Sequence, residues 1–444
     1  MSKYFIETYG CQMNTHDSER LAGLLESEGY ETTSSAATAD LVVVNTCSVR
    51  EKAEDKLYTR LGELEAMSAE RGWAPVVAVT GCVAQQEGSR LLRGGAAIDV
   101  IVGTQSLKRL PELVAEARAS HRARVDISPY DDVSFPLGMV RHSDPVRARI
   151  TIIEGCNEFC SFCVVPYTRG HERMRPVADI LAEVQKAAAS GRIEVQLLGQ
   201  IVNHYQAPDD ARCDFPELLT RVSQVAGIRR IRFASPHPRH VTPRLIEAIR
   251  DLPAVCKHLH VPLQSGSNRV LAGMRRRHTR EAYLDLVAAV RAAVPGITLS
   301  TDLIVGFPGE TDADFEETMS LVRLVCYQAL YSFKYSPRPN TLAAKRLSDD
   351  VPEREKTRRI VELQALQRDI QIRRHGEMVD TVDEVLVEGL SRRRATELTG
   401  RTGGNEAVNF PGPITWVGRL LPVRITEAAP NSLRGEVVEP AHVG

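Results

Sequence analysis

Residues 154–163 read Glu-Gly-Cys-Asn-Glu-Phe-Cys-Ser-Phe-Cys and place Cys156, Cys160 and Cys163 in one short stretch. The alternating apolar run at 149–153 comes directly before it and predicts a β-strand that enters a tight loop. Three thiolates on such a loop suit a soft metal, either a structural zinc ion or an iron–sulfur cluster. Structural zinc takes four protein ligands, and no second Cys or His pair follows nearby to complete a tetrahedron.

A 4Fe-4S cluster held by three cysteines leaves one iron open, and the amino and carboxylate groups of a methionine can occupy that iron. The Cys-x3-Cys-x2-Cys spacing, with Phe162 directly before the last cysteine, resembles that of radical S-adenosylmethionine (SAM) enzymes. Unliganded thiols are the weaker interpretation of cysteines spaced in this way after a strand. The stretch therefore predicts a cluster that binds SAM, with these three cysteines as its ligands and as catalytic residues.

The composition is that of an ordinary soluble globular protein with two or three domains. The chain has 444 residues, of which 43% are apolar and 25% charged, and its formal net charge is −1. No apolar run approaches the roughly 20 residues that span a bilayer, and the first residues lack the apolar core of a signal peptide, so we expect a cytoplasmic protein without a membrane partner. In that compartment the nine cysteines are better metal ligands than disulfides. Cys213, Cys256 and Cys326 lack ligand spacing and are expected to be ordinary small residues.

The first 120 residues alternate short apolar runs with helical patterns, which predicts a parallel α/β domain. The predicted strands are 4–6, 41–44, 76–79 and 100–102, and the predicted helices are 15–28, 51–71, 85–93 and 107–119. Cys11, Cys47 and Cys82 each follow a different one of these strands. Because the carboxyl ends of parallel strands share one edge, the three should meet as a second cluster site with an open iron. Gln12, Asn45 and Gln85 are candidates to hydrogen-bond the sulfurs.

Scattered prolines and charges at 121–146 predict a linker, and the core that follows is expected over 147–374. Six strand-like runs occur at 149–153, 193–198, 229–233, 257–263, 297–305 and 329–335, with helical segments at 177–190, 214–226, 242–251, 279–294 and 311–326. Six βα repeats predict a partial (β/α)6 barrel that is open on one side. Polar and glycine residues at the strand ends are candidate cofactor contacts, namely Gly199, Gln200, Gln264, Ser265, Asp302 and Gly306.

Two basic groups lie beside the same predicted edge and are candidates to bind phosphates. One consists of Arg169, His171, Arg173 and Arg175, and the other of Arg269, Arg275, Arg276, Arg277, His278 and Arg280. Residues 375–444 alternate short strands with Gly-, Pro- and Asn-rich turns, which predicts a small antiparallel β-barrel. Its basic patch, expected to face RNA, is Arg392, Arg393, Arg394 and Arg401.

The whole chain resembles the methylthiotransferase family of radical SAM enzymes. The resemblance rests on 7–14 (Glu-Thr-Tyr-Gly-Cys-Gln-Met-Asn), 45–51, 81–85, 164–170, 264–267 and 335–339, and the final barrel resembles a TRAM domain through 400–402 and 408–410. Within the family the chain is most similar to the branch that modifies N6-isopentenyladenosine in tRNA, through Asn45-Thr46-Cys47-Ser48-Val49-Arg50 and Val164-Val165-Pro166-Tyr167. Met174, Ile201 and Asn340 depart from the expected Ser, Asn and Gly.

The resemblance implies a tRNA methylthiotransferase with two 4Fe-4S clusters. The Cys156/Cys160/Cys163 cluster would cleave one SAM to a 5′-deoxyadenosyl radical, which removes hydrogen from C2 of the adenine; the Cys11/Cys47/Cys82 cluster would supply sulfur, and a second SAM the methyl group. The expected partners are tRNA carrying N6-isopentenyladenosine and an electron donor such as flavodoxin or ferredoxin, and the protein is expected to be a monomer. Alternatives are methylthiolation of threonylcarbamoyl-adenosine in tRNA, methylthiolation of a ribosomal-protein aspartate, or a non-catalytic iron–sulfur protein that binds RNA.

Overall fold

The computed structural model describes residues 1–48, 51–94, 97–128 and 140–438. The chain divides into two compact units, one comprising Met1–Ser143, Arg149–Phe159 and Cys163–Glu183, the other Asp144–Ala148, Cys160–Phe162 and Val184–Gly444. Residues 129–139 of the expected linker, two residues of the 45–51 motif and the last six residues of the expected barrel lie outside the described residues.

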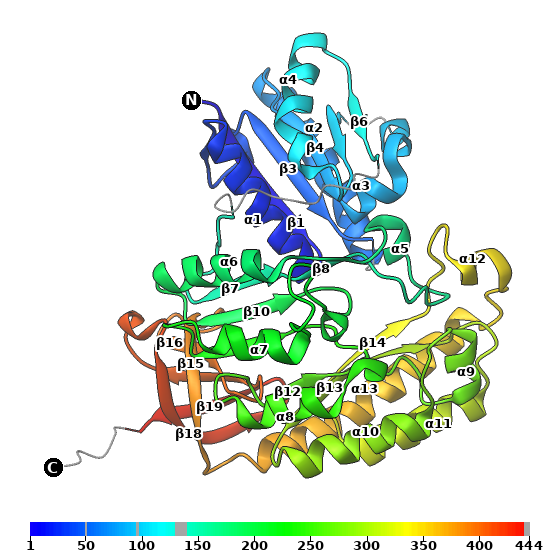
Figure 1. Ribbon diagram of the computed structural model, residues 1–444. Coiled ribbons are helices and arrows are strands. Elements are labelled where there is room, and N and C mark those ends of the chain that lie inside the picture. Colours follow the sequence, from blue (N-terminus) through cyan, green and yellow to red (C-terminus); the bar gives the residue numbers. More distant parts are fainter. Residues whose placement is uncertain (49–50, 95–96, 129–139, 439–444) are drawn as a thin grey trace. The chain divides into compact units, whose positions relative to one another are not determined.

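A six-stranded parallel sheet in the order β2-β1-β3-β4-β5-β6 forms the centre of the first unit (Figure 1). Its strands are β1 Lys3–Tyr9, β2 Glu31–Thr32, β3 Leu41–Thr46, β4 Val76–Gly81, β5 Val100–Val102 and β6 Arg124–Asp126. The four predicted strands are confirmed as β1, β3, β4 and β5. The short, polar edge strands β2 and β6 carry no apolar run, so the sequence did not reveal them, and β6 extends the sheet beyond residue 120.

Helices cover both faces of this sheet, because its central strands are apolar on both sides. Helices α1 (Gln12–Ser27) and α4 (Leu110–Ser120) pack on one face, around Leu21, Leu113 and Val43. Helices α2 (Glu51–Arg71) and α3 (Cys82–Glu87) pack on the other face, around Leu61, Val83 and Val44. The short 3-10 turns are η1 Ala36–Thr38, η2 Gly88–Gly94 and η3 Leu107–Arg109.

Six strands form the predicted partial barrel. They are β7 Arg147–Thr151, β10 Glu194–Leu198, β11 Arg230–Phe233, β12 His258–His260, β13 Thr298–Val305 and β14 Ala329–Lys334. Among them, β10 with β11, β12 with β13 and β13 with β14 pair in parallel. Two three-stranded sheets, β11-β10-β7 and β12-β13-β14, are joined by a parallel bridge between Ile231 and Val255. The sheet stops at β14, so the prediction of an incomplete barrel is confirmed.

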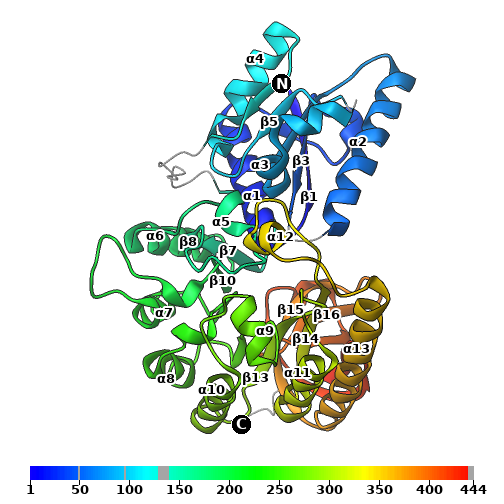
Figure 2. The same ribbon diagram turned by 90° about the vertical axis from the view of Figure 1, so that its right-hand side faces the viewer.

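Helices separate these strands as the sequence predicted, and Figure 2 shows α8, α10, α11 and α13 along the outside of the second unit. The helices are α6 Val177–Ala189, α7 Phe215–Ser223, α8 Pro243–Asp251, α10 Arg280–Ala293 and α11 Asp312–Val325. The shorter elements are β8 Ile153–Glu154, α5 Val165–Thr168, β9 Arg173–Met174, η4 Val202–His204, η5 Pro238–His240, α9 Asn268–Gly273 and α12 Leu342–Arg346.

Helix α13 (Glu353–Gly376) leads to a closed five-stranded barrel in the order β15-β16-β17-β19-β18. Its elements are β15 Val382–Leu390, β16 Glu397–Arg401, β17 Ala407–Pro411, η6 Ile414–Trp416, β18 Leu420–Ala429 and β19 Ser432–Val437. The barrel is antiparallel except between β17 and β19, which run parallel. Phe410, Leu398 and Val423 fill its interior.

This small barrel is joined to the core of the same unit through buried arginines. Arg230 donates to the carbonyl of Arg401 at 2.7 Å, and Arg232 donates to the carbonyl of Thr402 at 2.6 Å. The Thr298 hydroxyl donates to the Gly404 carbonyl at 2.7 Å. Because a buried guanidinium without acceptors is costly, the barrel contributes to the stability of the core.

Candidate cluster and cofactor sites

Cys11, Cys47 and Cys82 lie at the carboxyl ends of three neighbouring strands, as predicted. Cys11 is the N-cap of α1 after β1, Cys47 follows β3, and Cys82 opens α3 after β4. Glycines let these chain segments approach closely. A Cβ on Gly10 would lie 2.6 Å from Cys47 Cβ, and one on Gly81 would lie 2.4 Å from Asn45 Oδ1.

The three thiols interact with one another. The interaction with the Cys47 thiol lowers the pKa of Cys11 to about 6, and the interaction of Cys82 with the same thiol lowers the pKa of Cys82 to about 7. These two interactions raise the pKa of Cys47 far above its usual range. No set of three His, Cys, Asp or Glu side chains in the described ranges surrounds a single metal ion. A 4Fe-4S cluster instead takes each thiolate on a separate iron, so three converging sulfurs at one sheet edge fit it.

A buried amide pair supports Cys11. Asn14 Oδ1 lies 3.2 Å from Cys11 Sγ, while Asn14 Nδ2 donates to Asn45 Oδ1 at 3.0 Å. Asn45 was expected beside the sulfurs, and it reaches Cys11 through Asn14. Gln85 Nε2 instead donates to the Ile127 carbonyl at 2.8 Å, and Gln12 is exposed. Asn14 was missed, although its position three residues after an N-cap is where a side chain can reach back to the cap.

Arg169 and Asp17 form a buried ion pair beside the same cysteines. Arg169 Nη2 lies 2.6 Å from Asp17 Oδ2, and Arg169 is only 5% exposed. Three influences set the pKa of Cys11 and of Cys82. The interaction with Cys47 is the largest and lowers both values, burial comes next and raises them, and the charge of Arg169 follows and lowers them. This guanidinium thus places a fixed positive charge next to the predicted cluster ligands.

The predicted phosphate-binding role is wrong for Arg169, because its charge is buried against Asp17, and it stays a prediction for the other residues of the two basic groups. Arg169 pairs with Asp17, and Arg175 Nη1 lies 2.6 Å from Glu183 Oε2. Arg269 pairs with Asp314, and Arg280 donates to the carbonyls of Gly266 and Glu317. The partners of Arg169 and Arg269 are distant in sequence, so the run of charges alone could not reveal them.

The second set of cysteines lies on the loop between β8 and α5. Strands β8 and β9 pair antiparallel at its base, where the Cys156 amide donates to the Gly170 carbonyl at 3.2 Å. Gly155 has φ +79°, and a Cβ there would lie 2.0 Å from the His171 carbonyl oxygen, so this turn requires glycine. Cys156 is buried, whereas Cys160 and Cys163 are partly exposed.

Contacts within the second unit hold the middle of this loop. The Ser161 amide donates to the Met274 carbonyl at 3.0 Å, and the Ser161 hydroxyl donates to the Gly273 carbonyl at 2.7 Å. Arg276 Nη1 lies 3.6 Å from Cys160 Sγ. A loop fixed at this point, with two of its three thiols partly accessible, fits a cluster whose fourth iron must stay open to a ligand.

The candidate cofactor residues fall into two groups. Gln264 has φ +77° and its amide donates to the Asp302 carbonyl, while Asp302 Oδ2 lies 3.4 Å from His260 Nε2. Gln200 Oε1 is buried and has no hydrogen-bond partner within the described chain, which leaves it an acceptor for a ligand. Gly199 joins it to the end of β10.

Ser265 and Gly306 have evident packing roles instead. The fully buried Ser265 hydroxyl accepts from the Ser267 amide at 3.2 Å, where the chain enters α9. A Cβ on Gly306 would lie 2.4 Å from Lys356 Cγ, and Gly306 has φ +71°, so packing and backbone already require glycine there. These contacts do not need a cofactor to explain them.

The three residues that depart from the family pattern fit their local surroundings. Met174 pairs with Ile153 across β8 and β9, and Ile201 is buried. Asn340 has φ +67°, a conformation in which asparagine best replaces glycine. Of the remaining cysteines, Cys213 and Cys256 are buried, and Cys326 ends α11 in a left-handed conformation.

In the small barrel, the predicted RNA-facing residues differ in their surroundings. Arg392 and Arg393 are exposed. Arg394 Nη1 lies 3.1 Å from Glu397 Oε1, and Arg401 Nε lies 3.5 Å from Glu388 Oε1. The first two arginines are therefore the freer cations of this patch.

Comparison with known families covers all three parts of the chain. Residues 3–103 match Uncharacterized protein family UPF0004, residues 150–322 match the Radical SAM superfamily, and residues 376–438 match the TRAM domain. Two solved structures share the fold: the radical SAM methyltransferase TsrM from Kitasatospora setae (TM-score 0.58, 16% identity, covering 78% of this chain and 77% of that one) and the cobalamin-dependent enzyme OxsB (TM-score 0.53, 12% identity, covering 83% and 56%). The fold and these matches define a radical SAM protein with an N-terminal UPF0004 domain and a C-terminal TRAM domain.

Curated relatives narrow this class to one family. Proteins named tRNA-2-methylthio-N(6)-dimethylallyladenosine synthase are 45% identical in Solibacter usitatus, over 98% of this chain and 97% of the relative, and 46% identical in Geobacter metallireducens, over 98% of each. A third, from Thiobacillus denitrificans, is 46% identical over 99% of this chain and 98% of its own. The chain belongs to the family of tRNA-2-methylthio-N(6)-dimethylallyladenosine synthases.

Proposed function

We propose that this protein methylthiolates C2 of N6-isopentenyladenosine, also called N6-dimethylallyladenosine, next to the anticodon of tRNA. The observation that carries the proposal is the 45% identity to synthases of that name over 98% of the chain. The two separate three-cysteine sites support it, because the reaction needs both a radical and a source of sulfur. The TRAM match at 376–438 supports an RNA substrate.

Cys156, Cys160 and Cys163 would hold the 4Fe-4S cluster that binds SAM, and Cys11, Cys47 and Cys82 the second one. When bound, the clusters and SAM supply one-electron cleavage of SAM, sulfur and a methyl group. The chain positions them. Gln200 and Asp302 would offer polar contacts to SAM, and Gly199, Gln264, Ser265 and Gly306 would shape its surroundings.

Two further features of the chain serve this chemistry. The Arg169 guanidinium, held by Asp17, offsets the negative charge that thiolates bring to the first site. The Asn14 amide, held by Asn45, fixes the orientation of the Cys11 side chain. Both are positioning roles, since neither group needs to touch the tRNA.

The partners proposed are tRNA, bound in part through Arg392, Arg393, Arg394 and Arg401, and a small electron carrier of the flavodoxin or ferredoxin kind. The protein would act as a monomer in the cytoplasm. Among the described residues, no helix is both long and apolar enough to cross a membrane. Sedimentation of the reconstituted protein tests the oligomeric state.

The decisive experiment is mass spectrometry of nucleosides from the tRNA of cells that lack and then regain this protein. We expect 2-methylthio-N6-isopentenyladenosine to disappear and return, with the unthiolated nucleoside accumulating in between. Loss of a methylthiolated threonylcarbamoyl-adenosine, or of a methylthiolated ribosomal-protein aspartate, would instead favour one of the related activities. Unchanged nucleosides and protein would favour a non-catalytic RNA-binding protein.

A further inference from the structure

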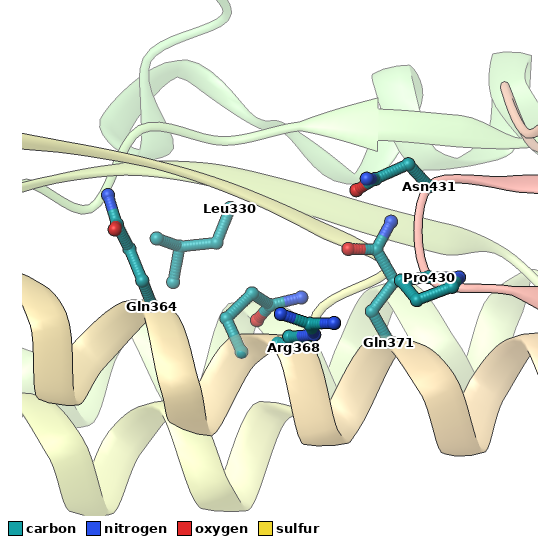
Figure 3. Close-up of a pocket in the computed structure, with 7 residues that line it drawn as sticks. Leu330, Gln364, Arg368, Gln371, Pro430 and Asn431 are labelled. Carbon is teal, nitrogen blue, oxygen red and sulfur yellow. The ribbon is translucent and has the colours of Figure 1, made fainter.

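Helix α13 borders two cavities that differ in the charges of their walls. Figure 3 shows the first, of about 300 Å³, where Gln364, Arg368 and Gln371 lie beside Leu330 of β14 and Asn431 of the TRAM barrel. The exposed Arg368 is the only charged residue in its lining. The second cavity, of about 350 Å³, lies at the end of α13 and is lined by charges of both signs. Charges of both signs can select a ligand that carries the complementary pair.

The second cavity lies where the TRAM barrel meets the beginnings of three core strands. Lys257 precedes β12, Thr298 begins β13 and Gln328 precedes β14, and all three line the cavity. Asp383 and Glu406 of the barrel line it as well. Its volume is at the small end of the roughly 300–1,000 Å³ that is usual for ligand pockets. The space therefore suits a metabolite of amino-acid size.

Two buried polar atoms in this lining lack partners. Gln328 is 6% exposed and Glu406 is 5% exposed. Gln328 Oε1 accepts from Arg374 Nε at 2.7 Å, and Glu406 Oε2 accepts from the Thr402 hydroxyl. By contrast, Gln328 Nε2 and Glu406 Oε1 make no hydrogen bond within the described residues. Because buried polar atoms are nearly always paired, these two point to a ligand that offers both an acceptor and a donor.

Arg374 and Gln328 form the donor set of the cavity. Only Nε of Arg374 is engaged, so its two Nη groups have no hydrogen-bond partner in the part of the chain that the structure describes. A guanidinium beside an amide NH₂ group suits a carboxylate, which accepts charge-assisted hydrogen bonds. The Lys257 ammonium is used elsewhere, because it donates to the carbonyls of Arg250 and Leu252 at the end of α8, at 3.1 and 3.2 Å.

Glu406, Asp383 and Glu377 form the acceptor set. Neither Asp383 nor Glu377 makes a salt bridge within the described ranges, although both line the cavity. Burial raises the pKa of Asp383, an effect that a cation beside it would oppose. No three acidic side chains among the described residues surround a metal position. The cation that fits is therefore one that donates hydrogen bonds, such as an ammonium group.

We propose that this cavity binds a free α-amino acid with an apolar side chain. The carboxylate of the amino acid accepts from the donor set, and its ammonium donates to the acceptor set. Met378 and Pro295 line the same cavity and offer apolar contacts to the side chain. Because the lining comes from both the core and the TRAM barrel, a bound amino acid also stabilises their junction.

The test titrates the reconstituted full chain with L-leucine by isothermal titration calorimetry. N-acetyl-L-leucine lacks the ammonium and L-leucine methyl ester lacks the carboxylate, so each should bind at least about tenfold more weakly than leucine. Arg374→Met and Glu406→Gln should each weaken leucine by about tenfold as well. Arg373→Met and Glu436→Gln change exposed residues of the same helix and barrel that do not line the cavity, so these matched controls should keep wild-type affinity. Circular dichroism checks that each variant is folded.

An amino acid can also bind an open iron, so Cys160→Ala is titrated too and should keep wild-type affinity for leucine. If Cys160→Ala loses leucine binding while Arg374→Met and Glu406→Gln retain it, the cluster holds the amino acid and the proposal is overturned. Absence of saturable leucine binding in the millimolar range would overturn it as well, since the cavity then holds only water. A derivative that binds as tightly as leucine would mean that only one charge is recognised, which also contradicts the proposal. None of these results bears on methylthiolation of tRNA, which is measured separately.

Discussion

The two cysteine sites reach similar chemistry by different routes. Cys156, Cys160 and Cys163 lie on one loop, so their spacing in sequence alone sets how far apart the thiols can be. Cys11, Cys47 and Cys82 come from three strands of one sheet, and only the folded sheet brings them together. The first arrangement is local and partly accessible, whereas the second is mostly buried and depends on tertiary structure.

This difference predicts different sensitivities. The loop site should respond mainly to loss of its own ligands. The sheet site should respond both to loss of ligands and to changes in the groups that hold α1 in place, because Cys11 is the N-cap of that helix. Helix α1 is unusual in burying a polar face, with Asn14, His16, Asp17, Glu19 and Arg20 all buried. Each of these residues needs a partner to offset burial.

The largest effect is expected from Cys160→Ala at the loop site. Without this ligand no SAM should be cleaved, so neither 5′-deoxyadenosine nor modified tRNA should form above background under strong reductant. Iron content should fall by about four per chain. Both products are quantified by liquid chromatography and mass spectrometry after anaerobic reconstitution. Substantial 5′-deoxyadenosine from this variant would remove the loop site from SAM cleavage.

Cys82→Ala should disable the sheet site while the loop site continues to cleave SAM. This variant should also lose about four irons, yet still produce 5′-deoxyadenosine, because its remaining cluster holds the SAM. No sulfur should enter isopentenylated tRNA. Circular dichroism provides the control that the chain is folded. Methylthiolation by a Cys82→Ala protein that lacks the sheet cluster would falsify the assignment of sulfur supply to this site.

The difference between a site on one loop and a site built from three strands also decides how much of each can be predicted from the sequence. The loop cysteines were assigned as ligands from spacing alone, and that assignment stays a prediction. That Cys11, Cys47 and Cys82 lie at one sheet edge could be predicted from their position after three parallel strands. The Asp17 partner of Arg169 could not be predicted, since 152 positions separate them. For that reason Arg169 was interpreted as a phosphate ligand when it is a buried structural charge.

Glycine and serine residues at strand ends were the other difficulty. The sequence pattern at Gly306 is the same whether a cofactor or a helix lies against it, and in the structure Lys356 of α13 lies there. Similarly, the Ser265 hydroxyl accepts a hydrogen bond from the Ser267 amide just before α9, a local role that shares its residue preference with ligand binding. The closed barrel was predictable from its turns, but the parallel pairing of β17 with β19 depends on contacts distant in sequence.

Asp17→Asn should destabilise the region of the sheet site, because Asp17 pairs with the buried Arg169 beside its cysteines. It leaves the buried Arg169 without its carboxylate, and breaking such a pair destabilises by about 3–5 kcal/mol. Urea unfolding of the metal-free protein, followed by circular dichroism, measures the loss. Glu316→Gln is the control, because Glu316 and its partner Arg323 are both exposed, and it should cost less than about 1 kcal/mol. Equal losses in the two variants would contradict a special role for the buried pair.

Acid should loosen the same region. Burial alone would raise the pKa of Glu183, but His16 of α1, whose Nε2 lies 3.6 Å from Glu183 Oε1, and the charge of Arg175 lower it to about 2. The folded state therefore favours the carboxylate, and this contribution is present above the unfolded value near 4.3 and is lost as pH falls from there toward 2. It amounts to about 3 kcal/mol at neutral pH.

Amide hydrogen exchange of α1 in the metal-free protein, at fixed pH steps between 6 and 3 with the intrinsic rates corrected, would show this loss as rising opening rates. In the Glu183→Gln variant, α1 should already open more readily at pH 6 than in wild type. Its opening rate should then rise less on acidification. Identical pH profiles for wild type and variant would mean that other groups set the acid sensitivity of α1.

The smallest effect is expected in the TRAM barrel, which carries none of the predicted cluster ligands. Deleting residues 375–444 would expose Arg230 and Arg232 of the core, so point variants are the cleaner test. Arg392→Ala and Arg393→Ala should each weaken tRNA binding only modestly, and each should reduce the slope of log affinity against log salt by about 1 if the side chain contacts a phosphate. Arg354→Ala, an equally exposed charge on α13, is the control and should leave the slope unchanged. SAM cleavage without tRNA should be the same in all three, because none of these residues contacts a cluster ligand. If the slopes of the two barrel variants match that of wild type, this patch does not bind the tRNA backbone.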